Sequence, residues 1–450
     1  MDGDMVILAL PADYAGEVFK DPLAINAIKS GQPMGAAGRY TAQRTLNIFY
    51  HHVPQWLQAI VSPIDSIYLA TGLFYLLCHV LFIYFMARLI TGIKNPINKN
   101  NLIIYAITSP LLAFYGYQEV QGLIDHAPTY TFYYIWPTLI ILFIFLPMIR
   151  ILLYPDAKGF NFIGFLCALI VGIFISQGGP LAPVVIIMWG GMILLALIYN
   201  IKFLNNFQSV TDRRSKFIYP VTILIVMLIC SLYANYISKY NPEFITNDAL
   251  VPLAQRFGLL FKGLAWILTK RLGFSLLLIS TNINFIILNK IAIGYWKQFK
   301  FFISALLLFS IIYIMLLPFG GYREYRPLII RYDTLIPVTI CLFVAFIHSS
   351  WYLLNNLQGV NRKIYTGFIT LIIGINAIAD VGIKRSEQCE KETLQLIAAS
   401  SADTIWINNQ CNIIAWRPLT NPYDANLISK MLQVWNITDR DKLFLQKVNK

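Results

Sequence analysis

Long apolar segments recur along most of this sequence, and they restrict its fold more than any other feature. Segments of about 20 apolar residues match the length at which a helix crosses the hydrocarbon core of a bilayer. Charged residues make up only 13% of the chain, whereas a soluble domain contains roughly 25%. A transmembrane β-barrel would instead require short segments of alternating hydrophobicity. We therefore predict an all-α polytopic membrane protein.

The apolar pattern predicts about ten transmembrane helices. Two of them, at 102–117 and 364–379, are close to the shortest length that can span a bilayer. The expected spans are residues 67–87, 102–117, 132–153, 160–176, 181–199, 217–237, 272–288, 301–317, 335–353 and 364–379.

Basic residues are concentrated in every second connection between these segments. The first two of the other connections contain no lysine or arginine: residues 118–128 are acidic and residues 177–180 are uncharged. Cytoplasmic loops are enriched in lysine and arginine, so the basic connections are predicted to be cytoplasmic. Their basic residues are Arg88, Lys94, Lys99, Arg150, Lys158, Lys202, Arg213, Arg214, Lys216, Lys290, Lys297, Lys300, Arg362 and Lys363.

This topology predicts three regions in a multi-pass protein of a bacterial inner (plasma) membrane. Residues 1–66 form a first extracytoplasmic loop with amphipathic helices, and residues 67–379 form the transmembrane domain. An outside N-terminal segment of this length requires a preceding helix, so we expect an eleventh span upstream of Met1. The net charge of +13 is attributed to loop topology and to anionic lipid headgroups, and nucleic acid is not an expected partner.

Residues 380–450 are predicted to form a small extracytoplasmic α/β domain. We expect a helix, then one or two strands over residues 403–419, then a helix that starts at Asn421 and Pro422. Cys389 and Cys411 lie in this region, which faces an oxidising compartment. The sequence leaves open whether they form a disulfide or remain two free thiols.

A short polar stretch, residues 320–334 (GGYREYRPLIIRYDT), separates two of the longest apolar segments; we call it the arginine loop. Guanidinium groups bind phosphate through paired hydrogen bonds, and tyrosines favour the depth of the lipid headgroups. The loop faces outside, where a positive charge is not a topology signal, so we predict a phosphate-binding role. The residues proposed to bind phosphate are Arg323, Arg326, Arg331, Tyr322 and Tyr325.

Two further expectations concern this loop. Its arginines could instead pair with Glu324, Asp333 or headgroup phosphates, as in an ordinary loop. If the stretch is extended, Arg323 and Arg331 share one face and Arg326 lies on the opposite one.

Residues 251–274 have an apolar face and a basic face at helical spacing. This pattern predicts a helix that lies in the membrane interface, although contact with substrate is an alternative. The basic residues assigned to that face are Arg256, Lys262, Lys270 and Arg271.

Two acidic motifs lie in the predicted outside loops. The first is Asp2-Gly3-Asp4, and the second is Asp125-His126. Paired carboxylates beside a lipid phosphate can hold a divalent cation or remove a proton from an acceptor group. We therefore name Asp4, Asp2, Asp125 and His126 as candidate catalytic residues, with Asp2 and Asp4 as the candidate ligands of any divalent cation.

The order of these features resembles the GT-C superfold of integral-membrane glycosyltransferases. In that superfold the first outside loop carries an acid directly after the first helix, and a second acidic motif and a late basic loop follow. MDGDMVILALPADY, Asp125-His126 and the arginine loop occur in this order. The chain differs from clear members because it lacks the first helix and any DD, ED or WWDYG-type motif.

The resemblance implies an inverting transfer of a sugar from a polyprenyl-phosphate donor to an envelope glycan, lipid or protein acceptor. Asp4 would be the base, with Asp2 as its closest competitor and Asp125 or His126 assisting. The arginines would neutralise the phosphate leaving group. No soluble nucleotide sugar is required.

Two other function classes remain open on the sequence. A transporter or lipid flippase could use the polar residues inside spans, although these residues also suit hydrogen bonding between helices. The residues are Asn282, Asn284, His348 and Asn376. A polysaccharide polymerase or ligase would also use outside arginines, but it seldom needs an acidic first loop.

Overall fold

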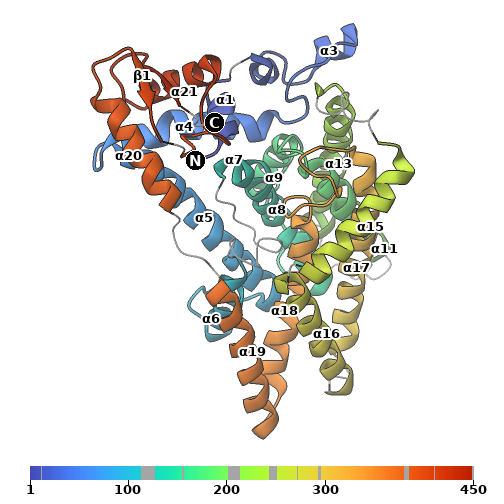
Figure 1. Ribbon diagram of the computed structural model, residues 1–450. Coiled ribbons are helices and arrows are strands. Elements are labelled where there is room, and N and C mark those ends of the chain that lie inside the picture. Colours follow the sequence, from blue (N-terminus) through green and yellow to red (C-terminus); the bar gives the residue numbers. More distant parts are fainter. Residues whose placement is uncertain are drawn as a thin grey trace.

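The computed structural model describes the chain except for residues 12, 113–126, 155–156, 201–212, 243–250, 271, 292–294, 380–384, 410 and 448–450. Helices make up most of it (Figure 1). The first and last described segments of the chain lie together at one end of a set of long helices.

Seven helices in the described part of the chain are long and apolar enough to cross a membrane. They coincide with seven of the ten predicted spans, which confirms the expected class of multi-pass helical protein. Their elements are α5 (Pro63–Thr91); α7 (Pro128–Tyr130), η4 (Thr131–Ile135) and α8 (Trp136–Leu153); α10 (Ala182–Val185), η5 (Ile186–Gly190) and α11 (Gly191–Asn200); η7 (Arg214–Ile218) and α13 (Tyr219–Ser238); α16 (Leu272–Ile291); α17 (Tyr295–Leu316) and η8 (Leu317–Gly320); and α18 (Ile336–Asn356).

The other three predicted spans correspond to shorter or less apolar helices. Residues 102–117 contain α6 (Lys99–Thr108) and η2 (Ser109–Leu112), and the end of this segment lies outside the described residues. The next, α9 (Phe162–Ile175), is apolar but has only 14 residues. The last, α19 (Gly359–Ala379), has 21 residues but begins with the polar sequence GVNRK. The count of ten spans therefore stays a prediction.

The boundaries of α5 follow from its sequence. The Ser62 side chain accepts a hydrogen bond from the Asp65 amide at the start of the helix, where Pro63 occupies the first position. The helix ends at Gly92, whose φ of 71° lies in the left-handed region that favours glycine.

Helix α18 is buried along most of its length, between the neighbouring long helices. Polar side chains join it to α16 and α19. The Asn284 amide donates to Ser349 Oγ at 2.9 Å and to Ser350 Oγ at 3.0 Å, and it accepts from the Tyr365 hydroxyl at 2.8 Å. These hydrogen bonds confirm that Asn284 joins packed helices.

The predicted interfacial helix corresponds to α15 (Leu253–Lys270). Its buried face packs against the arginine loop and η8. Contrary to the sequence expectation, Arg256 belongs to this buried face: its Nε donates to the Val251 carbonyl at 2.8 Å and its Nη1 to the Pro318 carbonyl at 3.3 Å. At Gly263 a Cβ atom would come within 2.7 Å of the Leu328 carbonyl oxygen, so only glycine permits this approach.

The N-terminal segment consists of short helices followed by one long amphipathic helix. In the order of the chain they are α1 (Gly3–Ala9), η1 (Asp13–Gly16), α2 (Glu17–Lys20), α3 (Ile25–Ser30) and α4 (Tyr40–Leu57). The long helix α4 packs against both α1 and α5.

The C-terminal segment contains α20 (Arg385–Ala399), β1 (Thr404–Ile407), α21 (Pro422–Val434) and β2 (Leu443–Gln446). The strands are parallel, with Thr404 opposite Leu443. As predicted, α21 starts at Asn421, whose side chain accepts from the Tyr423 amide at 2.9 Å. The second strand was not expected from the sequence, because it comes from residues after this helix.

The two ends of the chain pack against each other. The Trp435 indole Nε1 donates to the Tyr50 carbonyl at 2.8 Å, and the Gln58 amide donates to the Trp435 carbonyl at 2.7 Å. Lys391 of α20 forms an ion pair with Asp65 at the start of α5. These contacts attach the C-terminal segment to α4 and α5.

Candidate functional site

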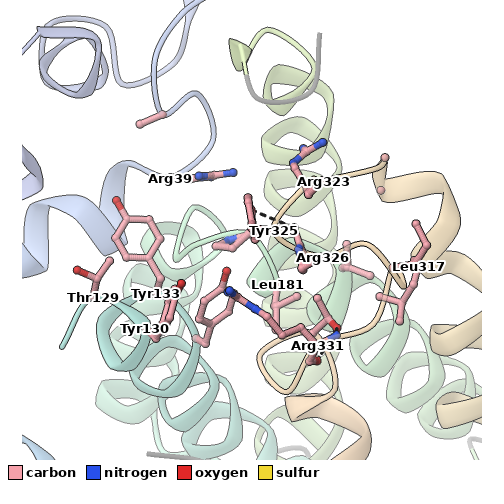
Figure 2. Close-up of a pocket in the computed structure, with 18 of the residues that line it drawn as sticks. Arg39, Thr129, Tyr130, Tyr133, Leu181, Leu317, Arg323, Tyr325, Arg326 and Arg331 are labelled. Atoms are coloured by element: carbon pink, nitrogen blue, oxygen red, sulfur yellow. Dashed lines mark hydrogen bonds between the residues drawn. The ribbon is translucent and has the colours of Figure 1, made fainter. Parts of the chain in front are cut away.

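A cavity of about 900 Å³ lies where the two ends of the chain meet the long helices (Figure 2). Residues from α1, the start of α4, η4, η5, the end of α17, the arginine loop and the C-terminal segment line it. The charged side chains in its described wall are Asp4, Arg39, Arg323, Arg326 and Arg331.

The arginine loop folds into successive turns. The Arg326 amide donates to the Arg323 carbonyl at 2.8 Å, the Ile329 amide to the Arg326 carbonyl at 3.0 Å, and the Thr334 amide to the Arg331 carbonyl at 3.1 Å. The stretch is therefore not extended, and the alternation that would place Arg326 on the opposite face does not apply. Because each turn reverses the backbone direction, all three arginines reach one cavity.

Arg331 is held by a carboxylate and by aromatic rings. Its Nε and Nη2 donate to the two oxygens of Asp333 at 3.0 and 2.6 Å, and Asp333 is buried. Its guanidinium lies 5.0 Å from the Tyr130 ring centroid and 5.1 Å from that of Tyr325. Burial lowers the pKa of Arg331, but the hydrogen bonds and charge of Asp333 outweigh it and raise this pKa above the usual value.

Arg326 is held less completely. Its Nη2 donates to the Tyr325 hydroxyl at 3.4 Å, while its buried Nε has no hydrogen-bond partner in the described part of the chain. Burial lowers the pKa of Arg326, but the Asp333 charge outweighs it, so this pKa also lies above the usual value. The guanidinium is therefore charged, and it lies in the wall of the cavity.

The other predicted members of the loop differ in position. Arg323 is 4% exposed and donates from Nη1 to the Tyr322 carbonyl at 2.8 Å. The Tyr325 side chain lines the cavity, whereas the Tyr322 ring packs on the hydrophobic core. Among the described lining residues, the loop thus contributes Tyr325 and not Tyr322 to the predicted phosphate site.

Asp4 and Asp2 belong to the same short helix, and their side chains have different surroundings. Asp4 lines the cavity. Asp2 is 1% exposed and caps α1: its Oδ1 accepts from the Asp4 and Met5 amides, each at 3.0 Å. Thr129 adds two donors, its hydroxyl to Oδ1 at 2.8 Å and its amide to Oδ2 at 2.9 Å.

Burial is the main cause that raises the pKa of Asp2 to about 6, and the hydrogen bonds from Thr129 oppose it. The structure separates the two carboxylates, because Asp4 lines the cavity whereas Asp2 is a buried helix cap. Among the described residues there is no group of three or more side chains suited to a metal ion. Asp125 and His126 lie outside the described residues.

Several lining residues were not identified from the sequence. Arg39, directly before α4, lines the cavity together with the arginine loop (Figure 2). Tyr133 and Tyr134 of the π-helical turn η4 both line the cavity. Trp416 comes from the C-terminal segment, where the sequence suggested only a strand.

One part of the wall is apolar. Aliphatic and methionine side chains of η5, of the segment before it, of the end of α17 and of η8 form it, and Phe319 beside them is 61% exposed. A cavity that joins guanidinium groups to an apolar wall suits an amphipathic ligand with an anionic head and an alkyl chain. The apolar side chains concerned are Leu181, Val184, Ile187, Met188, Leu316 and Leu317.

Comparisons of the chain with protein-family models, with curated proteins and with solved structures find no match. The resemblance to the GT-C superfold therefore stays a prediction.

Proposed function

We propose that this protein is an integral-membrane glycosyltransferase that moves a sugar from a polyprenyl-phosphate donor to an envelope glycan, lipid or protein acceptor on the extracytoplasmic face. One observation carries the proposal: Asp4, near the start of the chain, lines the same cavity as the arginine loop. A carboxylate and a group of guanidiniums in one cavity are what such a transfer needs.

The phosphate of the donor is assigned to Arg326. Its Nε is buried without a hydrogen-bond partner among the described residues, whereas the fork of Arg331 already binds Asp333. A phosphate oxygen in the cavity would gain a charge-assisted hydrogen bond from the Arg326 guanidinium, which lies in the cavity wall. Arg323 and Arg39 line the same cavity and add positive charge to it. Arg331 is assigned the role of holding Tyr130 and Tyr325.

The polyprenyl chain is assigned to the apolar wall formed by η5 and the end of α17. Phe319 and Leu316, which are 61% and 43% exposed, lie in this wall. Burying apolar groups of a lipid against such side chains is favourable by roughly 25 cal/mol per Å² where water is displaced. The head and the chain of the donor thus have separate, adjoining positions.

In the proposed reaction, Asp4 takes the proton of an acceptor hydroxyl or amine as that group attacks the anomeric carbon. The bond between this carbon and the phosphate oxygen breaks, and its electron pair leaves with the phosphate. The guanidiniums stabilise the charge that develops on the leaving group. Attack opposite the phosphate inverts the configuration at the anomeric carbon.

A transporter is the main competing function. The Asn284 side chain, which could have lined a path, is occupied by Ser349, Ser350 and Tyr365. This buried, hydrogen-bonded arrangement favours helix packing over a polar route through the long helices.

A deletion strain complemented with variants tests the proposal. Mass spectrometry of envelope glycans should find one glycan lost in the deletion strain, restored by the wild type, and absent with Asp4→Asn, which keeps the side-chain shape but removes the charge. Glu324→Gln is the matched control, because Glu324 is exposed and is not a lining residue. An unchanged glycan profile in the Asp4→Asn strain would refute the assignment of the base.

A further inference from the structure

The C-terminal segment contributes an exposed aromatic ring to the cavity. Trp416 is 46% exposed and lines the cavity together with Asp4. Its ring centroid lies 6.0 Å from that of Tyr130, which in turn contacts the Arg331 guanidinium. At Gly3 a Cβ atom would come within 2.6 Å of the Trp416 ring, so the indole packs directly on the backbone next to Asp4.

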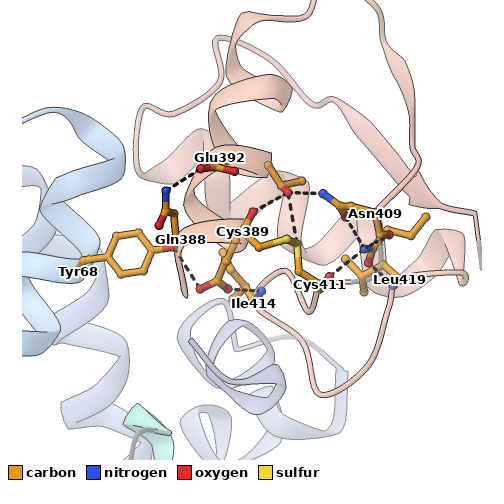
Figure 3. The surroundings of a disulfide bond; sticks show 11 residues. Tyr68, Gln388, Cys389, Glu392, Asn409, Cys411, Ile414 and Leu419 are labelled. Atoms are coloured by element: carbon orange, nitrogen blue, oxygen red, sulfur yellow. Dashed lines mark hydrogen bonds between the residues drawn. A yellow bond between two sulfur atoms is a disulfide. The ribbon is translucent and has the colours of Figure 1, made fainter. Parts of the chain in front are cut away.

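The backbone that carries Trp416 is fixed at several points (Figure 3). Cys411 forms a disulfide with Cys389 of α20. The neighbouring Glu390, which is 3% exposed, accepts a hydrogen bond from the Ile414 amide at 2.6 Å. The side-chain amide of Asn412 donates to the Trp416 backbone carbonyl at 3.2 Å. The indole is therefore presented to the cavity by a restrained backbone, although nearly half of its surface is uncovered.

We propose that Trp416 is a stacking platform for a carbohydrate ring in this cavity. The face of an aromatic ring carries partial negative charge and attracts the C–H groups on the apolar face of a pyranose. A side chain that is already held in place loses little conformational entropy on binding. The inference rests on the proposed function and adds the element that recognises the sugar.

The position of Trp416 suits this role. A sugar ring on the indole lies beside Asp4, on the side of the cavity where Tyr130 connects to the arginine loop. The ring can belong to the donor or to the acceptor, because both must meet at Asp4 for the transfer. An indole that only anchors the protein at the lipid headgroups would bind no sugar, and this is the alternative that the test decides.

The test uses the full chain in lipid nanodiscs and a panel of methyl glycosides of common hexoses, pentoses and amino sugars as probes. Tryptophan fluorescence should change on binding in the wild type, and Trp416→Leu should remove that change and raise the Kd by about three- to tenfold. Trp416→Tyr, which keeps an aromatic face, should stay within about twofold of the wild-type Kd.

Trp406→Leu is the matched control. Trp406 belongs to the same C-terminal segment and is 58% exposed, but it is not a lining residue and the Lys447 ammonium lies 5.9 Å from its ring centroid. Its replacement should leave glycoside binding unchanged. The platform is refuted if no glycoside of the panel binds, or if Trp416→Leu and Trp406→Leu bind glycosides equally well.

Two further measurements identify the source of the ring and separate this inference from the proposed function. A polyprenyl-phosphate mannose displaces the glycoside if the ring at Trp416 belongs to the donor and leaves it bound if the ring belongs to the acceptor; either result supports the platform. Sugar-free undecaprenyl phosphate should bind Trp416→Leu and the wild type equally. If it binds neither, the phosphate site of the proposed function fails, whatever the glycosides do.

Discussion

The arginine loop and the wall formed by α1 and Trp416 differ in how their side chains reach the cavity. The loop is continuous in sequence, so Arg323, Arg326 and Arg331 are only a few residues apart, and its turns bring all three to the same cavity. The other wall combines residues 4 and 416, which are distant in sequence. The cap made by Asp2 holds α1 at Asp4, while Glu390 and the disulfide hold the backbone that precedes Trp416. We call these the loop wall and the terminal wall.

This difference has a consequence for function. The loop wall carries charge and is assigned to the phosphate, so its variants should change donor binding. The terminal wall carries Asp4 and Trp416 and is assigned to proton removal and sugar binding, so its variants should change transfer while the phosphate still binds. If the two walls act separately, a variant in one wall leaves the binding step assigned to the other unchanged.

The largest effect is expected at Arg326. Arg326→Ala should weaken the binding of undecaprenyl phosphate by at least about tenfold, because it removes charge-assisted hydrogen bonds from a buried position. Arg326→Lys should restore this binding only in part, since an ammonium lacks the planar fork. Native mass spectrometry in nanodiscs measures the bound lipid.

Arg362→Ala is the control for this experiment. Arg362 is exposed at the start of α19 and is not a lining residue. Equal binding of undecaprenyl phosphate by the Arg326 and Arg362 variants would show that the loop wall does not bind the phosphate.

The disulfide should matter for the terminal wall alone. The double variant Cys389→Ser, Cys411→Ser should lower the free energy of unfolding of the C-terminal segment by ~3 kcal/mol. It should also weaken glycoside binding at Trp416 while undecaprenyl phosphate binds as in the wild type. Protease digestion at increasing temperature, followed by glycoside and lipid binding, measures the three quantities. Loss of lipid binding in this variant would show that the two walls are not separable.

Asp2 should make the stability of the terminal wall depend on pH. Its pKa of about 6 in the folded protein lies above the ordinary value of 3.8. Between about pH 4 and pH 6 the folded state therefore holds this proton more tightly than the unfolded state, and stability should fall as the pH rises through this range. Thermal unfolding in detergent at several pH values measures the effect.

Asp2→Asn provides the comparison for the pH measurement. It should flatten the dependence in that range, since no titrating group remains at the cap. A wild-type profile that rises with pH over the same range would contradict the burial of this carboxyl.

The smallest effect is expected far from both walls. Tyr365→Phe removes the hydrogen bond to Asn284 and should cost about 1 kcal/mol of stability without changing glycan transfer. A strong loss of activity in this variant would instead favour a polar path through the long helices. Complementation of the deletion strain and a thermal unfolding curve provide both readouts.

The sequence predicted the parts of the molecule that depend on local patterns. Apolar segments located seven long helices, and an arginine cluster and Asp4 were identified as residues of one site that the structure brings to one cavity. The cap at Asn421 was also predicted, because the capping residue and the proline next to it are adjacent in the chain.

The remaining features depend on contacts between distant residues. Asp2 and Asp4 are equivalent in the sequence, and the burial of Asp2 depends on Thr129, more than a hundred residues away. The turns of the arginine loop are supported by α15, where Gly263 permits the approach of the Leu328 carbonyl. Trp416 lines the cavity from a segment whose backbone is linked to α20 by the disulfide and by Glu390. No periodicity in the chain encodes these three relations.

The central claim is that this cavity binds the phosphate of a polyprenyl lipid beside Asp4. A cryo-electron-microscopy structure of the full chain in nanodiscs with undecaprenyl phosphate tests it directly. We expect phosphate density within about 3 Å of a guanidinium nitrogen of Arg326, with the alkyl chain along the wall formed by η5 and the end of α17. Phosphate density outside this cavity would contradict it.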